Sequence, residues 1–370
     1  MIWEGFVSNS NSSALLEEQK SARAKKIAIT LSASLVGIST AAIISGIVSY
    51  DAFFPRFERP DYALYPGMYC YERFEGGLVR QTMTIPSGEV DLAAYYYPVD
   101  APKGLVIIVH GIHAGGDDFL PMVEAMVQGG YAVFTYDATG NYSSGGDSGV
   151  GMCQQLVDLD AVLCWLEEQE PYRSMPKFLI GHSWGGYAAA SALALHSEIK
   201  ACVCIAPMCD GTTIMVEKSK EHIGDLAYTV KPIFDAYQWY LFGDYTRYNA
   251  VVGINSTDVP VVIVQGLDDT VITPDGQSIT AYLDELTNPN VSVHYTTGLQ
   301  GSHMGVLHSV EAEEYIAAVR KELERLEWEK GEPLTYSEKT AFYQTIDHRL
   351  YSEFNPELIS LILETFDKAG

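Results

Sequence analysis

Three short segments contain the residue types of a serine nucleophile, of the base that activates it and of the acid that orients the base. Ser183 lies in Gly-His-Ser-Trp-Gly, residues 181–185, directly after the apolar run KFLI and before the small-residue stretch GYAAASALAL. A serine between a strand and a helix presents its hydroxyl away from the sheet, but it attacks a carbonyl only when a base removes its proton. We predict that Ser183 is the nucleophile of an acyl-transfer reaction. The alternative is a glycine-rich helix start that Ser183 caps.

The acid that orients the base is expected on the loop after the apolar run 259–266. Asp268 and Asp269 both lie on this loop. The spacing Gly-x-x-Asp-x-x-Val/Ile selects Asp269, because Gly266 turns the chain and the apolar pair after the acid anchors the loop. Asp268 is interpreted as a solvated carboxylate, and Asp210, at the end of an earlier strand, is a third alternative.

The base is expected to follow the acid, in the order serine, acid, histidine. Among nine histidines, His303 lies in the glycine-flanked segment GLQGSHMG, after the final apolar run and before the final amphipathic helix. His308 comes five residues later and is interpreted as a packing residue. We therefore predict His303 as the base.

The negative charge of a tetrahedral intermediate needs backbone N–H donors that are already in place. The amide of Trp184, which follows the nucleophile, is one predicted donor. The amide of Ile112, in the loop after the run GLVIIV, is the other. His110 is expected to orient this loop, whereas His113 either reaches the pocket or lies in solvent.

Apolar runs that alternate with amphipathic segments must position these residues. Such runs predict strands of a parallel sheet with helices on both faces, an α/β fold. The predicted strands are 104–111, 131–137, 177–183, 201–207, 259–266 and 291–297, and the predicted helices are 117–130, 154–170, 186–194, a segment after Pro274 and 311–328. A β-hairpin is expected around Pro86-Ser87-Gly88. The helical block at about 208–258 is predicted to be a lid, and one or two closing helices are expected at about 333–370.

The segments HGIHAGG, YDATGNYSSGG, GHSWGG, GLDDTV and GSHMG resemble successive signatures of the α/β-hydrolase superfamily. The resemblance extends from Val79 to Leu326 and is greatest to membrane-anchored bacterial members of the monoacylglycerol lipase, lysophospholipase and serine aminopeptidase-like group. It implies a triad of Ser183, Asp269 and His303 and an inserted lid. It implies neither a cofactor nor a metal. Trp184 and the pair Ala138-Thr139 depart from many relatives and are expected to change the shape of the pocket.

The N-terminus contains 24 residues without a charge, 27–50. As a helix this segment is long enough for a bilayer core of about 30 Å. It is longer than a typical signal peptide core, so we predict an uncleaved, single-pass anchor, with a buried core helix as the alternative. Basic residues before the run place the tail, 1–26, in the cytoplasm. A connector at 51–78 and an extracytoplasmic catalytic domain at 79–370 complete the predicted organisation.

Charge and cysteine content exclude some partners. The chain has 23 basic and 48 acidic side chains, a net charge of −25, which makes nucleic acid an unsuitable partner. Its six cysteines show no zinc spacing and are interpreted as buried thiols, although a disulfide stays open in an exported domain. Asp158 and Asp160 are expected on a solvated helix face. The sequence does not indicate an oligomeric state.

The resulting expectation is a serine hydrolase that cleaves a carboxylic ester, including one derived from a lipid of the adjacent membrane, through an acyl-enzyme. Amide, peptide and thioester hydrolysis and acyl transfer remain alternatives, because the triad does not distinguish leaving groups. A different class of function is a catalytically silent, membrane-anchored binding protein.

Overall fold

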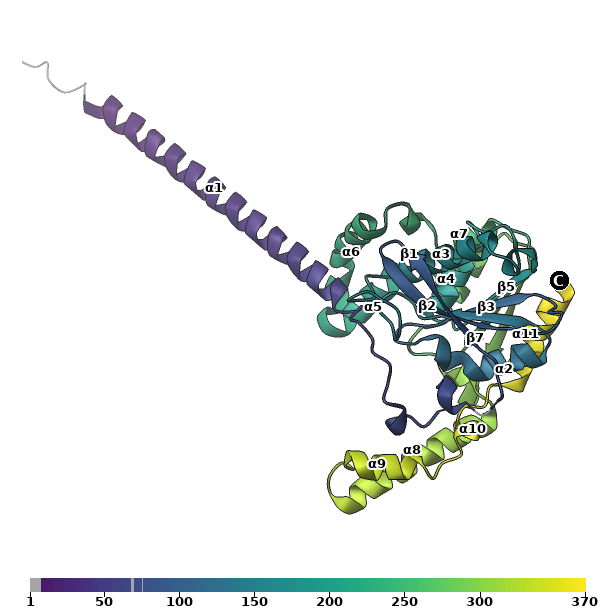
Figure 1. The fold of residues 1–370 in the computed structure, drawn as a ribbon. Helices are drawn as coiled ribbons and strands as arrows, with labels where there is room; N and C mark the ends of the chain where they lie inside the picture. Colours follow the sequence, from purple (N-terminus) through teal and green to yellow (C-terminus); the bar gives the residue numbers. More distant parts are fainter. Residues whose placement is uncertain (1–7, 68–69, 75) are drawn as a thin grey trace, which may run out of the picture. The chain divides into compact units, whose positions relative to one another are not determined.

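A computed structural model describes residues 8–67, 70–74 and 76–370 (Figure 1). The chain divides into two compact units, Met1–Tyr50 and Asp51–Gly370. Helix α1, Ser8–Asp51, contains the predicted anchor 27–50, but the side chains of residue 31 and residues 33–39 lie outside the described part. Within the described residues, no helix combines the length and the apolar composition needed to cross a membrane. The predicted anchor falls in part on residues outside the described part and stays a prediction.

The second unit is built on an eight-stranded sheet with the order β1-β2-β4-β3-β5-β6-β7-β8. The strands are β1 (Gln81–Ser87), β2 (Val90–Tyr97), β3 (Leu105–Val109), β4 (Ala132–Tyr136), β5 (Lys177–His182), β6 (Ile199–Ile205), β7 (Val261–Gly266) and β8 (Val291–Thr296). The predicted hairpin forms β1 and β2, and β2 pairs antiparallel with β4. All other pairs are parallel. The predicted α/β fold with a mostly parallel sheet is confirmed.

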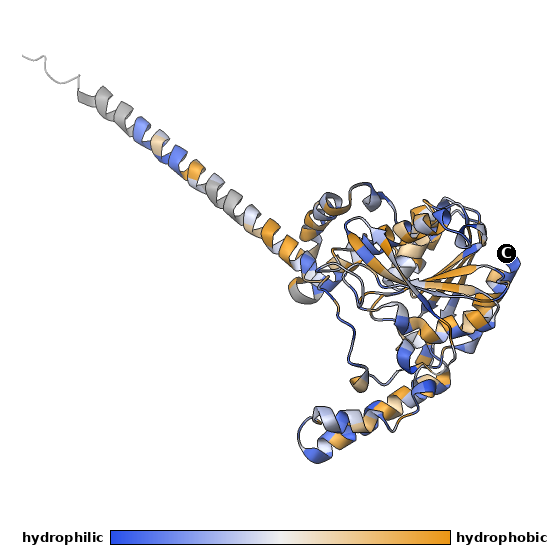
Figure 2. Cartoon of the chain, in the orientation of Figure 1, coloured by the Kyte–Doolittle hydropathy of each residue, from blue (hydrophilic) through white to orange (hydrophobic). Residues whose placement is uncertain are grey.

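Strands β3, β4, β5 and β7 are buried along their whole length and are largely apolar, because helices cover both faces of the sheet (Figure 2). On one side, α2 (Leu120–Gln128) packs against β4 and α11 (Pro356–Ala369) (Figure 1). On the other side, α4 (Trp184–Ala192) packs against both α3 (Gln154–Glu168) and α7 (Ala250–Asn255). The parallel register brings the carboxyl ends of β3, β5, β6, β7 and β8 to one edge, where the predicted site residues follow their strands.

The inserted block between β6 and β7 is helical, as predicted. It contains α5 (Gly211–Ile223), α6 (Ala227–Phe242) and the short α7. After β8 come α8 (Val310–Lys330), α9 (Tyr336–Tyr343), α10 (His348–Tyr351) and α11. Within 333–370 there are therefore three helices, α9, α10 and α11, and not the one or two that were predicted. Each of the three begins at its own N-cap, Thr335, Asp347 or Asn355.

Three further expectations were wrong in detail. The predicted helix 117–130 is a 3₁₀ turn, η3 (Gly116–Phe119), followed by α2, and the segment after Pro274 is the 3₁₀ helix η7 (Ile279–Glu285). Asp158 is fully buried, where it accepts hydrogen bonds from the Ser87 hydroxyl and the backbone amide of Thr139. Asp158 thus lies on the inner face of α3 and not on a solvated face. The spacing of residues along α3 does not reveal this, because a donor to the carboxylate comes from the loop after β4.

Candidate active site

Ser183 occupies the turn between β5 and α4 in a conformation that few residues other than glycine adopt. Its φ of 57° lies in the left-handed region, and strained backbone of this kind is common at reactive positions. The glycines on either side of Ser183 are required because other backbone atoms lie too close for a side chain. A Cβ on Gly185 would lie 2.1 Å from the carbonyl oxygen of Val109, and one on Gly181 would lie 2.2 Å from that of Gly185. The turn can therefore form only with glycine at these positions.

The structure brings the three residues of the predicted triad together. His303 Nε2 lies 3.0 Å from Ser183 Oγ, and His303 Nδ1 lies 2.7 Å from Asp269 Oδ2. A neutral imidazole that donates from Nδ1 to the carboxylate leaves Nε2 as the acceptor for the serine proton. The arrangement has the geometry of a nucleophile, a base and an orienting acid.

Asp269 is held as a carboxylate by several donors. Burial alone would raise its pKa, but the hydrogen bond from His303 and those from the amides of Ile272 and Val271 outweigh burial and lower the pKa. The side-chain amide of Gln265, which is buried on β7, also donates to Asp269 Oδ2. Gln265 was not singled out from the sequence, where a single polar residue in the run VVIVQG was its only signal.

The alternative acids and bases take other positions. Asp268 is exposed, and Asp210 accepts from the amides of Thr212 and Thr213 as the N-cap of α5. His308 Nδ1 lies 2.7 Å from a carboxylate oxygen of Glu313. None of these residues is hydrogen-bonded to Ser183 in the described part of the chain.

The loop after β3 lies next to the nucleophile. A Cβ on Gly111 would be 3.4 Å from the Cβ of Ser183, and Ile112 and Trp184 both line the same cavity as Ser183. His110 is buried, accepts from the amide of Ala138 through Nε2 and lies 2.7 Å from the carbonyl oxygen of Gly111 through Nδ1. It touches the loop and not the cavity. His113 is exposed and lines the cavity.

A second histidine, His182, adjoins the base. Its ring lies 4.9 Å from the ring of His303, and its Nε2 lies 3.2 Å from the carbonyl oxygen of His303. Burial, and then the neighbouring imidazole of His303, lower the pKa of His182 to about 3. His182 is therefore neutral and holds the backbone of the base without adding charge. The sequence placed it inside the Gly-x-Ser-x-Gly motif but indicated no role.

The cavity above Ser183 has a volume of about 830 Å³ and is mostly apolar. Its walls include the segment before β1, the loop after β3, helix α5 and the C-terminal helices, together with the segments that follow β4, β5, β6, β7 and β8. Apolar residues of these walls include Phe53, Phe54, Ile112, Phe119, Met152, Trp184, Met208, Ile214, Met215, Leu307, Ile316 and Phe354. The sequence did not reveal the contributions of Phe53, Phe54 and Phe354, because they lie far from the motifs along the chain.

Potential metal ligands gather at one place in the described residues, away from the cavity walls. Asp160, Cys164 and His196 lie within 4.8 Å of one another through their ligand atoms. Both ring nitrogens of His196 are already 2.8 Å from carboxylates, Nε2 from Asp160 and Nδ1 from Glu198. This cluster is built as a buried imidazolium between two carboxylates. All six cysteines are free thiols, five buried and Cys164 exposed.

Comparisons with known proteins concern the fold of the second unit. The family model described as serine aminopeptidase, S33, matches residues 100–253. No curated protein matches the chain. Among solved structures, the esterase Pf2001 of Pyrococcus furiosus is 21% identical with a TM-score of 0.51, over 68% of this chain and 92% of that one. The acylaminoacyl peptidase of Pyrococcus horikoshii is 18% identical with a TM-score of 0.44, over 61% of this chain and 37% of that one. The fold is that of the α/β-hydrolases.

Proposed function

We propose that this chain, an enzyme of the α/β-hydrolase type, cleaves a carboxylic ester with an apolar acyl group through a covalent acyl-enzyme. The observation that carries the proposal is the continuous chain of hydrogen bonds from Ser183 Oγ through His303 to Asp269, at the base of an apolar cavity. A neutral His303 accepts the Ser183 proton while Oγ attacks the ester carbonyl carbon. The carboxylate of Asp269 stabilises the imidazolium that results.

The remaining steps follow from the positions of the same groups. The N–H groups of Ile112 and Trp184 would donate to the oxyanion of the tetrahedral intermediate. His303 then returns its proton to the leaving alcohol as the C–O bond breaks, which leaves the acyl group on Ser183. A water molecule repeats the sequence, with His303 as base, and releases the acid and free Ser183.

Amide hydrolysis is a second candidate, supported by the match to the serine aminopeptidase model. The ester is favoured because the cavity lining is predominantly apolar and suits an acyl chain or an aryl group. A panel of p-nitrophenyl esters of graded chain length, measured beside aminoacyl anilides, distinguishes the two. Higher kcat/KM for the esters of longer acids supports the proposal, whereas turnover confined to anilides would replace it with the peptidase.

A fluorophosphonate probe separates an active hydrolase from a silent binding protein. The wild-type protein is expected to be labelled, and Ser183→Ala is not. Asp268→Asn is a suitable control, since Asp268 is exposed and lies on the same loop as Asp269. Absence of labelling in wild type, or labelling that persists in Ser183→Ala, contradicts the proposal.

The location of the chain stays a proposal based on the uncharged segment 27–50. We propose that it holds the catalytic unit at the outer side of a membrane, where lipid esters are supplied. Carbonate extraction of membranes from cells that express full-length protein tests attachment, and protease added to intact cells tests orientation. A chain that is released by carbonate is not anchored, and a protected catalytic unit lies on the cytoplasmic side.

A further inference from the structure

The segment that precedes the hydrolase sheet is built into the catalytic unit. We call residues 53–59 the strap. They run beside the loop 138–151, which follows β4, through isolated bridges between Pro55 and Ser148 and between Phe57 and Asn141. Backbone hydrogen bonds support them: the amide of Phe57 donates to Gly140, and the amide of Gly149 donates to Phe54, both at 2.9 Å. The strap is therefore held along its length and is not a free linker.

Arg56 adds a side-chain clamp to the same loop. Its guanidinium donates to the carbonyl oxygens of Tyr142, Ser144 and Gly146 at 2.9, 3.1 and 2.8 Å. A planar guanidinium satisfies several acceptors at once in a fixed geometry, which a flexible ammonium does not. The loop 138–151 is therefore fixed to the strap by both backbone and side-chain hydrogen bonds.

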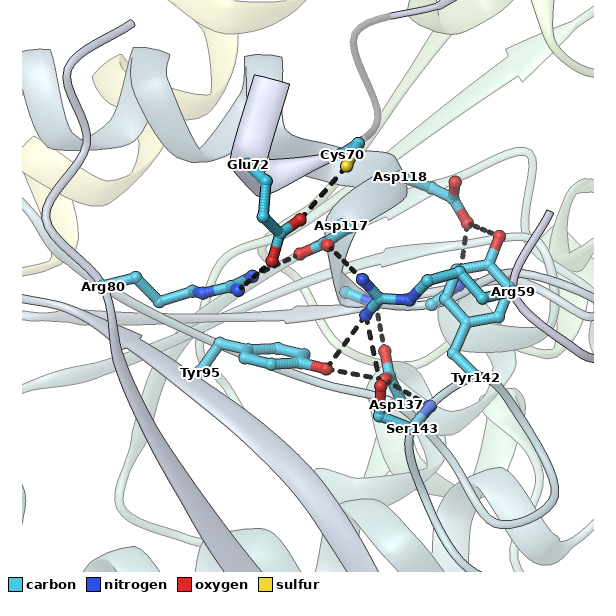
Figure 3. A network of polar contacts seen from close by, with 12 residues as sticks. Arg59, Cys70, Glu72, Arg80, Tyr95, Asp117, Asp118, Asp137, Tyr142 and Ser143 are labelled. Atoms are coloured by element: carbon cyan, nitrogen blue, oxygen red, sulfur yellow. Dashed lines mark hydrogen bonds and ion pairs between the residues drawn. The ribbon is translucent and has the colours of Figure 1, made fainter. Parts of the chain in front are cut away.

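The other end of the strap contacts the segment that follows β3. The ring of Phe57 stacks on His113, with centroids 5.0 Å apart and planes inclined at 28°. Arg59 pairs with the buried carboxylate of Asp117 at 3.2 Å and lies near Tyr95 and Ser143 (Figure 3). Asp117 belongs to η3, close behind Ile112. The strap thus packs against the loop that lies beside the nucleophile.

Two strap side chains face the substrate cavity. Phe53 and Phe54 both line it, and Phe54 is only 2% exposed. The ring of Phe54 lies 6.1 Å from that of Trp184, the residue that follows the nucleophile. Phe54 therefore bounds the cavity on the side of Trp184, whose neighbour in the chain is the nucleophile.

From these contacts we infer that the strap is a wall of the active site and that Phe54 limits the bulk of the acyl group beside Ser183. The inference rests on the proposed function. The family match begins at residue 100, so this wall lies outside the part of the chain that the family model describes. The substrates it favours are esters of unbranched acids, because a branched or cyclic group next to the carbonyl meets the Phe54 ring.

The test compares two phosphonofluoridates with the same leaving group, one with a methyl and one with a cyclohexyl group on phosphorus. The reading is the ratio of their inactivation rate constants, cyclohexyl over methyl. In the full-length Phe54→Ala protein this ratio is expected to rise about tenfold over wild type, the scale at which apolar pockets discriminate size. Phe54→Leu, which keeps most of the buried volume, is expected to raise the ratio less and serves if the alanine variant does not fold.

Phe342→Ala is the matched control, because Phe342 is half-buried on α9 and does not line the cavity. Its ratio is expected to equal that of wild type. Ratios within about twofold of wild type in folded Phe54 variants overturn the inference while the proposed function stands. If neither probe inactivates wild type, the proposed function fails first, and the inference falls with it.

Discussion

His303 Nε2 lies 3.0 Å from Ser183 Oγ, although 120 positions separate the two residues along the chain. The contact exists because β5 and β8 are parallel members of one sheet, and the segments that follow both strands leave at the same edge. Ligands and catalytic groups of open α/β sheets gather at this edge for the same reason. A short motif after one strand therefore finds its partner after another.

The choice of acid can be tested on neighbouring residues. Asp269→Asn keeps the shape of the side chain but removes the charge that holds His303, so we expect kcat/KM to fall about 10³–10⁴-fold. Asp268→Asn changes an exposed side chain of the same loop and is expected to leave kcat/KM within about twofold of wild type. The measurement is steady-state hydrolysis of a p-nitrophenyl ester. Equal losses in the two variants would exclude Asp269 as the orienting acid.

The nucleophile turn predicts a stability effect for one glycine. The Cβ of Gly185→Ala would meet the carbonyl oxygen of Val109 at 2.1 Å, so backbone must move and the free energy of unfolding is expected to fall by at least about 2 kcal/mol. Gly145→Ala is the control, since its Cβ would lie no closer than 3.4 Å to a neighbour. We expect it to change the free energy of unfolding by less than about 1 kcal/mol. Urea unfolding measures both, and similar losses would contradict the close approach.

The buried imidazolium of His196 predicts a pH dependence of stability. Burial opposes its charge, but hydrogen bonds to Asp160 and Glu198 outweigh burial and raise the pKa from 6.5 to about 9. Between these values the folded state keeps a proton that the unfolded state has lost. The stabilisation is therefore complete below about pH 6.5 and is lost as the pH rises through about 9.

His196→Gln tests this pH dependence. The variant is expected to be less stable than wild type by on the order of 2 kcal/mol at pH 6, and this difference should shrink towards pH 9. Tyr245, whose hydroxyl donates to Asp160, and the exposed thiol of Cys164 face the same cluster and remain unchanged in the variant. Urea unfolding at several pH values gives the difference. A difference that does not vary with pH would mean that folding does not shift the pKa of His196.

The clamp on the strap predicts a stability difference between two arginines. Arg56→Gln removes three hydrogen bonds to loop carbonyls and is expected to lower the free energy of unfolding by about 1–3 kcal/mol. Arg325→Gln removes exposed ion pairs with Glu322 and Glu329 on α8 and is expected to lower the free energy of unfolding less than Arg56→Gln does, because solvent screens these pairs. Thermal unfolding of both variants provides the comparison. An Arg56 variant as stable as the Arg325 variant would show that the strap is not held by this side chain.

Local patterns were sufficient for the elements that carry the motifs. The strands that precede Ser183 and Asp269 are continuous apolar runs, which indicate burial on both faces without any knowledge of their neighbours. Gly181 is required by a contact inside the Gly-x-Ser-x-Gly turn, with the carbonyl oxygen of Gly185, so Ser183 was predictable from its immediate surroundings. Gly185 is required by Val109 on the neighbouring strand β3, a contact that the sequence does not reveal. The burial of Asp158 was not predictable, because the sequence around a carboxylate on the inner face of a helix looks the same as that around one on the outer face.

The sequence by itself determined the α/β alternation, the helical insertion and the order of serine, acid and histidine, since each depends on residues close together in the chain. Only the tertiary structure decided that His182 and Gln265 support the base and the acid, and that Phe54 and Phe354 wall the cavity. Apart from Gln265, which is four residues from Asp269, these side chains contact segments that are distant along the chain. Phe54 and Phe354 are ordinary core residue types, and no short pattern indicates which partners His182 and Gln265 contact. Packing selects such partners, and packing is a property of the folded chain as a whole.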